Sequence, residues 1–258
     1  MATKSEIKFY SSLKQKKYRK LEHKFLAEGK RLVEEGVNSR FVCDRIFMTN
    51  EFVNSNSVFI KDISKQNILI DIVSKNDFLK ISSTKTPQGI LAVFKIPKIK
   101  SNYDKTRNIV ALENISDPGN LGTILRTCDW FGISNLLLSE DCAELYNPKV
   151  VRASMGAVFN LNVLDNIKLV DETKLLQQKN YQTFVADMDG ENYKNVKWQK
   201  KSIITFGNEA NGPSKELKQI SQKITIPQKG KVESLNVAAA AAVIISEVQN
   251  FNLSPLEK

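Results

Sequence analysis

Three loops rich in glycine, asparagine and other small polar residues hold the chain's main candidates for chemistry. They read NISDPGN (114–120), GNEANGPS (207–214) and QKGKVESLN (228–236), and each follows an apolar run typical of a buried strand. Glycine allows close approach of a backbone or ligand, while Asn, Asp and Ser cap helices and shape turns. A single loop of this kind is often only a strand-to-helix turn. Three together could line one pocket.

Several common catalytic and binding patterns are missing from the sequence. GxGxxG and GxxxxGK[ST] are absent, which disfavours a classical dinucleotide site and a nucleotide triphosphatase. GxSxG is also absent, and the single histidine, His23, lies in a basic N-terminal segment, so a hydrolytic triad is not expected. Cys43, Cys128 and Cys142 have no CxxC spacing, so neither a disulfide framework nor a metal site is predicted.

The elements that must position the loops alternate between strands and helices after residue 107. The predicted strands are 109–113, 135–139, 158–163, 181–187, 202–207 and 223–227. The predicted helices are 119–131, 148–155, 169–179, 213–220 and 234–250. Strongly apolar strands in this order predict a parallel sheet covered on both faces. Ligands of such sheets bind beyond the carboxyl ends of the strands, where the three loops lie.

The N-terminal part has a weaker pattern. Short apolar runs alternate with polar stretches from 37 to 97, which predicts a small α/β layer structure. Helical spacing of apolar residues over 20–36 predicts one amphipathic helix. We therefore expect an N-terminal domain at 1–97, a linker at 98–106 and a second domain at 107–258.

The charge of the chain points to a polyanionic partner. The 258 residues carry a formal net charge of +10, and residues 1–31 hold ten Lys and Arg against three Glu. This favours nucleic acid over a membrane surface, although a lysine-rich helix face is often only solvated. The candidate contacts are Lys14, Lys16, Lys17, Arg19 and Lys20. No apolar run reaches the roughly 18 residues of a membrane span, and a cytoplasmic protein is expected.

Three segments of the chain resemble, in order, the three motifs of the SpoU/TrmH family of RNA methyltransferases in the SPOUT superfamily. They are NISDPGNLGTILRT, GNEANGPS and IPQKGKVESLNVAAAAAV. NPKVVRASMGAVF at 147–159 resembles the family's middle segment. The resemblance implies a parallel-sheet domain with a deep trefoil knot, an exception to the rule against knots. It also implies that the N-terminal part is a small ribosomal-protein-like α/β/α domain that binds RNA.

The resemblance further implies an S-adenosylmethionine cofactor, no metal, and a homodimer formed through the knot domain. The positions that match the family's cofactor-binding residues are Gly207, Ile226 and Leu235. The last helix is expected in the dimer interface, and the run from Ala238 to Ala242 fits because small side chains let helices approach closely. A plain core helix explains this alanine run equally well.

The family's reaction transfers a methyl group to a ribose 2′-hydroxyl of RNA, and the resemblance assigns a catalytic role to Arg126. A hydroxyl is a weak acid, so its proton must leave or its developing charge must be stabilised. Two roles stay open for Arg126: a general base, or a cation that binds the adjacent phosphate and lowers the pKa of the hydroxyl. Because arginine loses its proton only at very high pH, the first role needs a special environment. An arginine paired with a surface carboxylate is the structural alternative.

The other positions that match catalytic residues of the family are Asn120, Glu209, Ser234 and Asn236. Each has an ordinary alternative, because Asn and Ser cap helices and a glutamate is favoured near a helix N-terminus. The chain departs from the usual family motifs at Asn208, Ala210, Gln228 and Ala238. These departures bear on the fine positioning of the cofactor.

The leading hypothesis is therefore a ribose 2′-O-methyltransferase that acts on RNA, with ribosomal RNA favoured over transfer RNA. A non-catalytic RNA-binding or assembly factor of the same fold is the alternative from another class. The presence of Arg126, Glu209, Ser234 and Asn236 argues against it.

Overall fold

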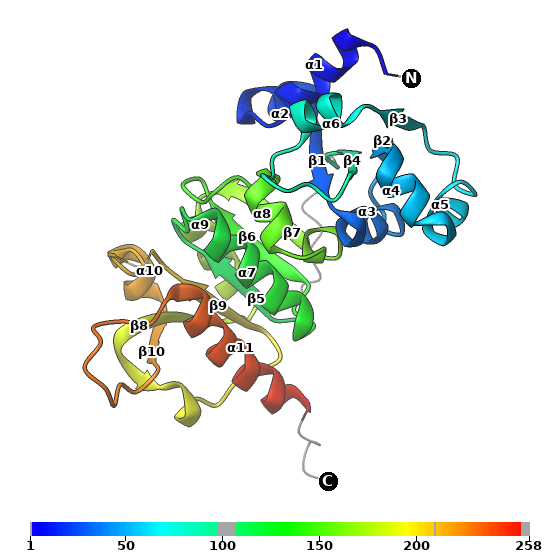
Figure 1. Ribbon diagram of the computed structural model, residues 1–258. Helices are drawn as coiled ribbons and strands as arrows, with labels where there is room; N and C mark the ends of the chain where they lie inside the picture. Colours follow the sequence, from blue (N-terminus) through cyan, green and yellow to red (C-terminus); the bar gives the residue numbers. More distant parts are fainter. Residues whose placement is uncertain (1, 98–106, 209, 254–258) are drawn as a thin grey trace. The chain divides into compact units, whose positions relative to one another are not determined.

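The protein is described by a computed structural model that covers residues 2–97, 107–208 and 210–253. The described residues form two compact units (Figure 1). The first contains the residues up to 97 together with 144–159, and the second contains the rest. The predicted linker at 98–106 lies outside the described residues. Contacts thus group 144–159 with the N-terminal residues, although these positions follow the linker in the chain.

The first unit is built on a four-stranded mixed sheet (Figure 1). In spatial order its strands are β1 (Lys24–Glu28), β4 (Ile90–Lys95), β2 (Cys43–Thr49) and β3 (Ile70–Val73). Strand β4 runs antiparallel to both neighbours, and β2 is parallel to β3. The helices are α1 (Lys4–Ser12), α2 (Lys16–Glu22), α3 (Lys30–Val37), α4 (Asn50–Ser55), α5 (Ser57–Ile63), α6 (Lys75–Ile81), α8 (Pro148–Ala153) and the 3-10 helix η1 (Ala157–Phe159). The predicted α/β layer structure is confirmed.

Side-chain alternation along the strands gives this sheet two buried faces. Leu26 of β1 lies in one hydrophobic cluster with Tyr10 of α1 and Phe78 of α6, so these two helices cover one face. Its neighbour Phe25 points to the opposite face, because successive side chains of a strand alternate. There the Phe25 ring lies 4.6 Å from that of Tyr146. Residues from both ends of the unit's sequence therefore build its core.

The sequence-based prediction of one helix over 20–36 is wrong. The chain forms the end of α2, then β1, then α3 in this region. His23 ends α2 in the left-handed region at φ +48°, and Gly29 has φ +108° just before α3. Between them, β1 pairs with β4 and buries Phe25, Leu26 and Ala27. Burial of three consecutive residues between two layers outweighs helical spacing here.

Segment 144–159 packs on the second face of this sheet. Helix α8 contacts β1, and the Phe159 ring lies 5.0 Å from that of Phe94 in β4. The predicted strand at 158–163 is therefore wrong at its start, because Val158 and Phe159 are buried in this core as part of η1. The strand in this region begins at Asn162.

A buried ion pair also ties 144–159 to the N-terminal helices. The guanidinium of Arg19 is 2 % exposed and forms an ion pair with Glu144, which is 13 % exposed. Its Nε lies 2.9 Å from Glu144 Oε1, and its Nη1 donates to the carbonyls of Leu13 and Lys14 at 2.8 and 2.7 Å. All its contacts are internal, so Arg19 is a structural residue of this unit.

The second unit is built on a six-stranded sheet in which every pairing is parallel (Figure 1). Its strands in spatial order are β10 (Gln222–Thr225), β8 (Gln182–Asn192), β9 (Ser202–Phe206), β5 (Ile109–Leu112), β6 (Asn135–Ser139) and β7 (Asn162–Ile167). Its helices are α7 (Pro118–Trp130), α9 (Leu169–Gln177), α10 (Lys215–Ile220), α11 (Val237–Leu253) and the 3-10 helix η2 (Tyr193–Asn195). The predicted parallel sheet is confirmed.

Both faces of this sheet are covered. Ile109 of β5 lies in a cluster with Leu176 of α9 and Leu217 of α10, and these helices also contact each other. Val110, the next residue of β5, points to the other face and is fully buried as well. Helices α7 and α11 pack against each other in this unit. Continuous burial along β5 explains why its sequence is an unbroken apolar run.

Among the described helices, none combines the length and apolar character required to cross a membrane. The trefoil knot expected from the family resemblance stays a prediction.

We expect Arg19→Met to destabilise the first unit by about 3–5 kcal/mol, because it leaves the Glu144 carboxylate buried without its cation. Urea unfolding gives the loss of stability, and hydrogen exchange should rise in residues 13–23 and 144–152. Lys65→Met is the matched control, because the Lys65–Asp62 pair at 2.9 Å is exposed on both sides and should contribute nothing measurable. Equal exchange in both variants would contradict a structural role for Arg19.

Candidate active site

The first loop turns the chain from β5 into α7. Asn114 has φ +56°, and the Asp117 Oδ1 atom accepts a hydrogen bond from the Asn120 amide at 2.9 Å. Asp117 is therefore the N-cap of α7, and Pro118 occupies the first turn of the helix, where its missing N–H costs nothing. The polar cluster after the buried strand serves to start this helix at the sheet edge.

The second loop, after β9, forms two hydrogen bonds with the first loop and with Glu113, the residue just before it. The Asn208 Nδ2 atom donates to the Asn114 carbonyl at 3.1 Å, and the Ser214 amide donates to Glu113 Oε2 at 2.6 Å. This loop folds tightly on itself: a Cβ atom on Gly207 would lie 2.2 Å from the Pro213 nitrogen. Only glycine fits there, because no real Cβ contact is that short.

The third loop is bound to the first through two asparagines. The Asn236 Nδ2 atom donates to Asn120 Oδ1 at 3.0 Å. The Asn236 Oδ1 atom accepts from the amides of Ala238 and Ala239 at 2.9 and 3.3 Å, which caps the start of α11. One side chain thus both starts the last helix and contacts the first loop. The expectation that the three loops lie together is confirmed by these contacts.

The remaining predicted catalytic residues are placed differently. Arg126 is exposed on α7, and its guanidinium has no hydrogen-bond or ion-pair partner among the described residues. This removes the alternative of a surface ion pair within the described chain. Ser234 is exposed in the third loop. Glu209 lies outside the described residues.

Of the residues predicted to bind the cofactor, Gly207 begins the second loop, Leu235 lies in the third loop, and Ile226 directly follows β10. Gly207 is buried, Ile226 is half-buried and Leu235 is 50 % exposed. The unusual residue Gln228 shapes the third loop, because its Nε2 atom donates to the carbonyls of Gly230 and Val232 at 3.0 and 2.6 Å. The side-chain amide of Gln228 therefore stabilises the loop through hydrogen bonds to the loop's own backbone.

Two features that support the first loop were missed in the sequence. Glu113 accepts the Ser214 amide, as described above, and Cys142 lies against the end of β5. The Cys142 thiol donates to the Leu112 carbonyl at 3.2 Å, and burial raises the pKa of this thiol, so it keeps the proton it donates. Cys142 follows β6, which pairs with β5 in the sheet. In the sequence, the only sign of this role was its place shortly after the predicted strand 135–139.

The predicted RNA-binding residues of the first unit fall into two groups. Lys16, Lys17 and Lys20 are exposed on α2. Lys14 donates from Nζ to the Lys80 carbonyl at 2.6 Å, at the end of α6, and Arg19 is buried with Glu144. Arg19 is therefore withdrawn as an RNA contact, because its guanidinium is not accessible.

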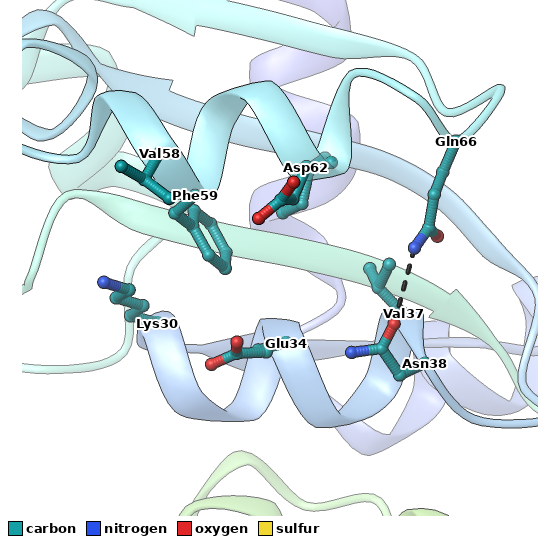
Figure 2. A pocket seen from close by; sticks show the side chains of 9 residues that line it. Lys30, Glu34, Val37, Asn38, Val58, Phe59, Asp62 and Gln66 are labelled. Atoms are coloured by element: carbon teal, nitrogen blue, oxygen red, sulfur yellow. Dashed lines mark hydrogen bonds between the residues drawn. The ribbon is translucent and has the colours of Figure 1, made fainter.

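A cleft of about 250 Å³ also lies in the first unit, between α3 and α5 (Figure 2). Glu34 and Asp62 project into it from opposite helices, and Gln66 closes one end by donating to Asn38 Oδ1 at 3.4 Å. Two carboxylates make this cleft unsuited to an anionic ligand. None of the predicted site residues lines it.

The described ranges contain no group of three His, Cys, Asp or Glu side chains that could hold a metal ion. The two carboxylates described at the first loop, those of Asp117 and Glu113, accept hydrogen bonds from backbone amides.

Asn236→Ala should destabilise the second unit by about 1 kcal/mol, because it removes the cap of α11. Asn236→Asp is the matched variant: its carboxylate still accepts the two helix amides but cannot donate to Asn120. We therefore expect unfolding in urea to leave Asn236→Asp near the parent stability and Asn236→Ala below it. Equal stability of all three proteins would contradict the capping role.

Comparison with known proteins agrees with this geometry. The profile of the SpoU rRNA Methylase family matches residues 107–246, and that of the MRM3-like substrate binding domain matches residues 4–92. The chain is 31 % identical over 247 residues to the Bacillus subtilis 23S rRNA (guanosine(2553)-2′-O)-methyltransferase RlmP, covering 95 % of this chain and 96 % of the relative.

Two solved structures share both units. A TrmH-family protein from Porphyromonas gingivalis is 33 % identical with a TM-score of 0.86, covering 97 % of this chain and 99 % of that one. An S-adenosylmethionine-bound rRNA methyltransferase from Sinorhizobium meliloti is 25 % identical with a TM-score of 0.85, covering 98 % and 97 %. Together with the three joined loops, these matches show that the chain belongs to the SpoU rRNA methylase family.

Proposed function

We propose that this protein methylates a ribose 2′-hydroxyl of ribosomal RNA, with S-adenosylmethionine as the methyl donor. The observation that carries the proposal is the joining of the three loops around Asn120 and Asn236, next to the helix that bears Arg126. Family membership and the similarity to RlmP support the same reaction. Ribosomal RNA is favoured over transfer RNA because RlmP, a relative that matches the chain over nearly its full length, is named for 23S rRNA.

The residues present fit the cofactor. Leu235 and Val232 are 50 % and 67 % exposed and offer apolar surface. Within the described chain, the backbone amides of 228–235 are not hydrogen-bonded to protein, which leaves donors for a ligand. Gly207 allows the tight second loop beside them. When bound, S-adenosylmethionine supplies a sulfonium methyl group that an oxygen nucleophile can attack.

Of the two roles open for Arg126, we favour the cation that binds phosphate. Its guanidinium is exposed and has no partner in the described chain, so it can bind a phosphate oxygen pair. Solvated arginine keeps its proton, and the positive charge would stabilise an oxygen that becomes negative during attack. The base would then be another group or water.

Asn120 and Asn236 position the substrate in this proposal. Their mutual hydrogen bond fixes both side chains, and a fixed polar group can hold a ribose hydroxyl or phosphate in line for transfer. Ser234, exposed in the same loop, is proposed to contact the ribose or its phosphate. Glu209 keeps its proposed role on the basis of the family motif alone.

Affinity for RNA is proposed to come in part from Lys16, Lys17 and Lys20, the exposed cations of α2. Lysines that contact phosphates release counterions, so this binding should weaken as salt rises. A protein that acts on ribosomal RNA in this way is expected in the cytoplasm.

We further propose a homodimer formed through the second unit. Helix α11 presents Val243 and Phe251, 38 % and 49 % exposed, and α7 presents Trp130, 84 % exposed. Part of the alanine run serves the chain itself, since Ala238 and Ala241 are buried. The apolar side chains that remain exposed on these two helices are suited to a second copy of the chain.

Light scattering on the purified protein should give twice the chain mass of 29.1 kDa. Trp130→Glu together with Phe251→Glu should shift the mass toward that of one chain, because charges are costly in an apolar interface. Lys174→Glu, an exposed change on α9, is the control and should leave the mass unchanged. A parent protein with the mass of a single chain would refute the dimer.

Transfer of labelled methyl from S-adenosylmethionine to unmodified rRNA and tRNA tests the reaction. We expect label in rRNA, in alkali-resistant dinucleotides that mark a ribose position. Arg126→Ala should lower the rate by at least about 100-fold if Arg126 stabilises the developing charge. Arg126→Lys should recover little, because an ammonium lacks the bidentate fork.

Cofactor affinity, measured by calorimetry, is the control for Arg126→Ala and should stay unchanged. Label found in tRNA alone would show that the substrate is transfer RNA and not ribosomal RNA. Cofactor binding without transfer to either RNA would favour the non-catalytic RNA-binding factor.

A further inference from the structure

A loop of the first unit, residues 82–88, is held at both ends by side chains. At its start, Glu28 Oε1 accepts from the hydroxyls of Ser82 and Thr84 at 2.6 and 2.5 Å, and Oε2 accepts from the Ser83 amide at 2.9 Å. At its end, Gln88 Oε1 accepts from the Lys30 amide at 2.9 Å, at the start of α3. The loop is therefore fixed at both of its ends.

The middle of this loop presents a cation to solvent. Lys85 and Thr86 are exposed between the two fixed ends. No described carboxylate forms an ion pair with Lys85. A fixed loop with a free ammonium is preorganised for an anion, because little conformational freedom is lost on binding.

A second cation reaches the same loop from a distant part of the sequence. Arg152, in the last turn of α8, donates from Nη1 to the Ser83 hydroxyl at 3.3 Å. This is the one polar contact of its side chain within the described residues, so most of its five N–H donors remain for another ligand. Ser83 and Lys85 are two residues apart, at most about 7 Å along the chain.

Nearby carboxylates are already engaged by protein groups. Glu28 accepts the hydrogen bonds from the loop described above, and Glu144 is paired with Arg19. The α2 lysines belong to the same surface region, because Lys14, just before α2, donates to the Lys80 and Ser82 carbonyls at 2.6 and 3.4 Å. The hydroxyl and amide groups that bind Glu28 leave its negative charge in place, and the Ser83 hydroxyl that contacts Arg152 also lies 3.1 Å from Glu28 Oε2. Lys85, Arg152 and Lys14 supply three positive charges against this one, so the net charge around loop 82–88 is positive.

We propose that Lys85 and Arg152 form a phosphate-binding site for the RNA backbone. The Arg152 guanidinium, oriented by Ser83, binds phosphate oxygens through its planar fork, and the Lys85 ammonium adds a point charge. The site extends the basic surface of α2, so one RNA strand can contact both. Arg152 lies in the segment matched by the methyltransferase profile, yet it packs in the first unit.

This inference rests on the proposed function, since it assumes an RNA substrate. Phosphate is favoured over an acidic protein partner because the two cations flank a polar, hydroxyl-rich loop without exposed large apolar residues. Hydroxyls and guanidinium groups are common phosphate contacts, whereas protein interfaces place apolar anchors at their centre.

The test measures the Kd of the full-length protein for a labelled, unmodified 23S rRNA transcript across a series of KCl concentrations. Lys85→Ala with Arg152→Ala should raise the Kd about tenfold and reduce the log–log salt slope by between about 1 and 2. A triple variant provides the reference for the RNA affinity lost when the α2 lysines are removed. It combines Lys16→Gln, Lys17→Gln and Lys20→Gln. Lys61→Ala, an exposed lysine of α5, should leave the Kd unchanged.

Arg152→Lys separates charge from geometry. It keeps the cation, so the salt slope should stay near the parent value while the affinity falls several-fold. S-adenosylmethionine affinity and urea unfolding of each variant show whether the fold is retained.

The proposed site would be refuted if the Lys85→Ala, Arg152→Ala protein had the same Kd for RNA and the same salt slope as the parent protein. So would equal losses in the Lys61→Ala control, or a loss of RNA binding confined to variants that unfold. If the parent protein itself neither binds nor methylates RNA, the proposed function fails instead, and the two failures are distinct.

Discussion

The hydrogen bond between Asn236 and Asn120 joins residues 116 positions apart, and the arrangement of the active site depends on it. Parallel strands end at one edge of a sheet, but this only brings their loops near one another. Side chains that donate to or accept from a neighbouring loop fix the final geometry: Asn236 to Asn120, Asn208 to Asn114, and Glu113 to Ser214. Each of these side chains has lost its freedom before a substrate arrives, which is what transfer between two bound groups requires.

Secondary structure was predicted correctly where burial of a strand on both faces produces an unbroken apolar run in the sequence. The parallel sheet was predicted because strands such as β5 are covered on both faces and read as unbroken apolar runs. The helix at 20–36 was predicted wrongly because Leu21, Phe25 and Leu32 are spaced as on a helix. In the structure Leu21 is 65 % exposed, and Phe25 is in a strand held by β4. Pairing with a strand about seventy residues away is invisible to a local period.

Some features of the site were also predictable from the sequence, and others were not. Asn120 and Asn236 were predicted from the motif order, and the structure brings them together. The role of Arg19 could not be read from the charge pattern, because its partner Glu144 lies 125 residues further along the chain. Likewise, Gln228 was seen as a departure from the family motif, but its bonds to Gly230 and Val232 depend on a loop path that the sequence does not specify.

The placement of 144–159 affects how the protein can fold during synthesis. The N-terminal sheet needs Tyr146 and Phe159 to cover Phe25, and it needs Glu144 to neutralise Arg19. A ribosome makes these residues only after β5, α7 and β6 of the second unit. Helix α3 already covers part of this aromatic face, beside Phe94. The rest of the face stays uncovered in the nascent sheet until residue 159 has emerged, so the first unit completes its core only after part of the second unit has been made.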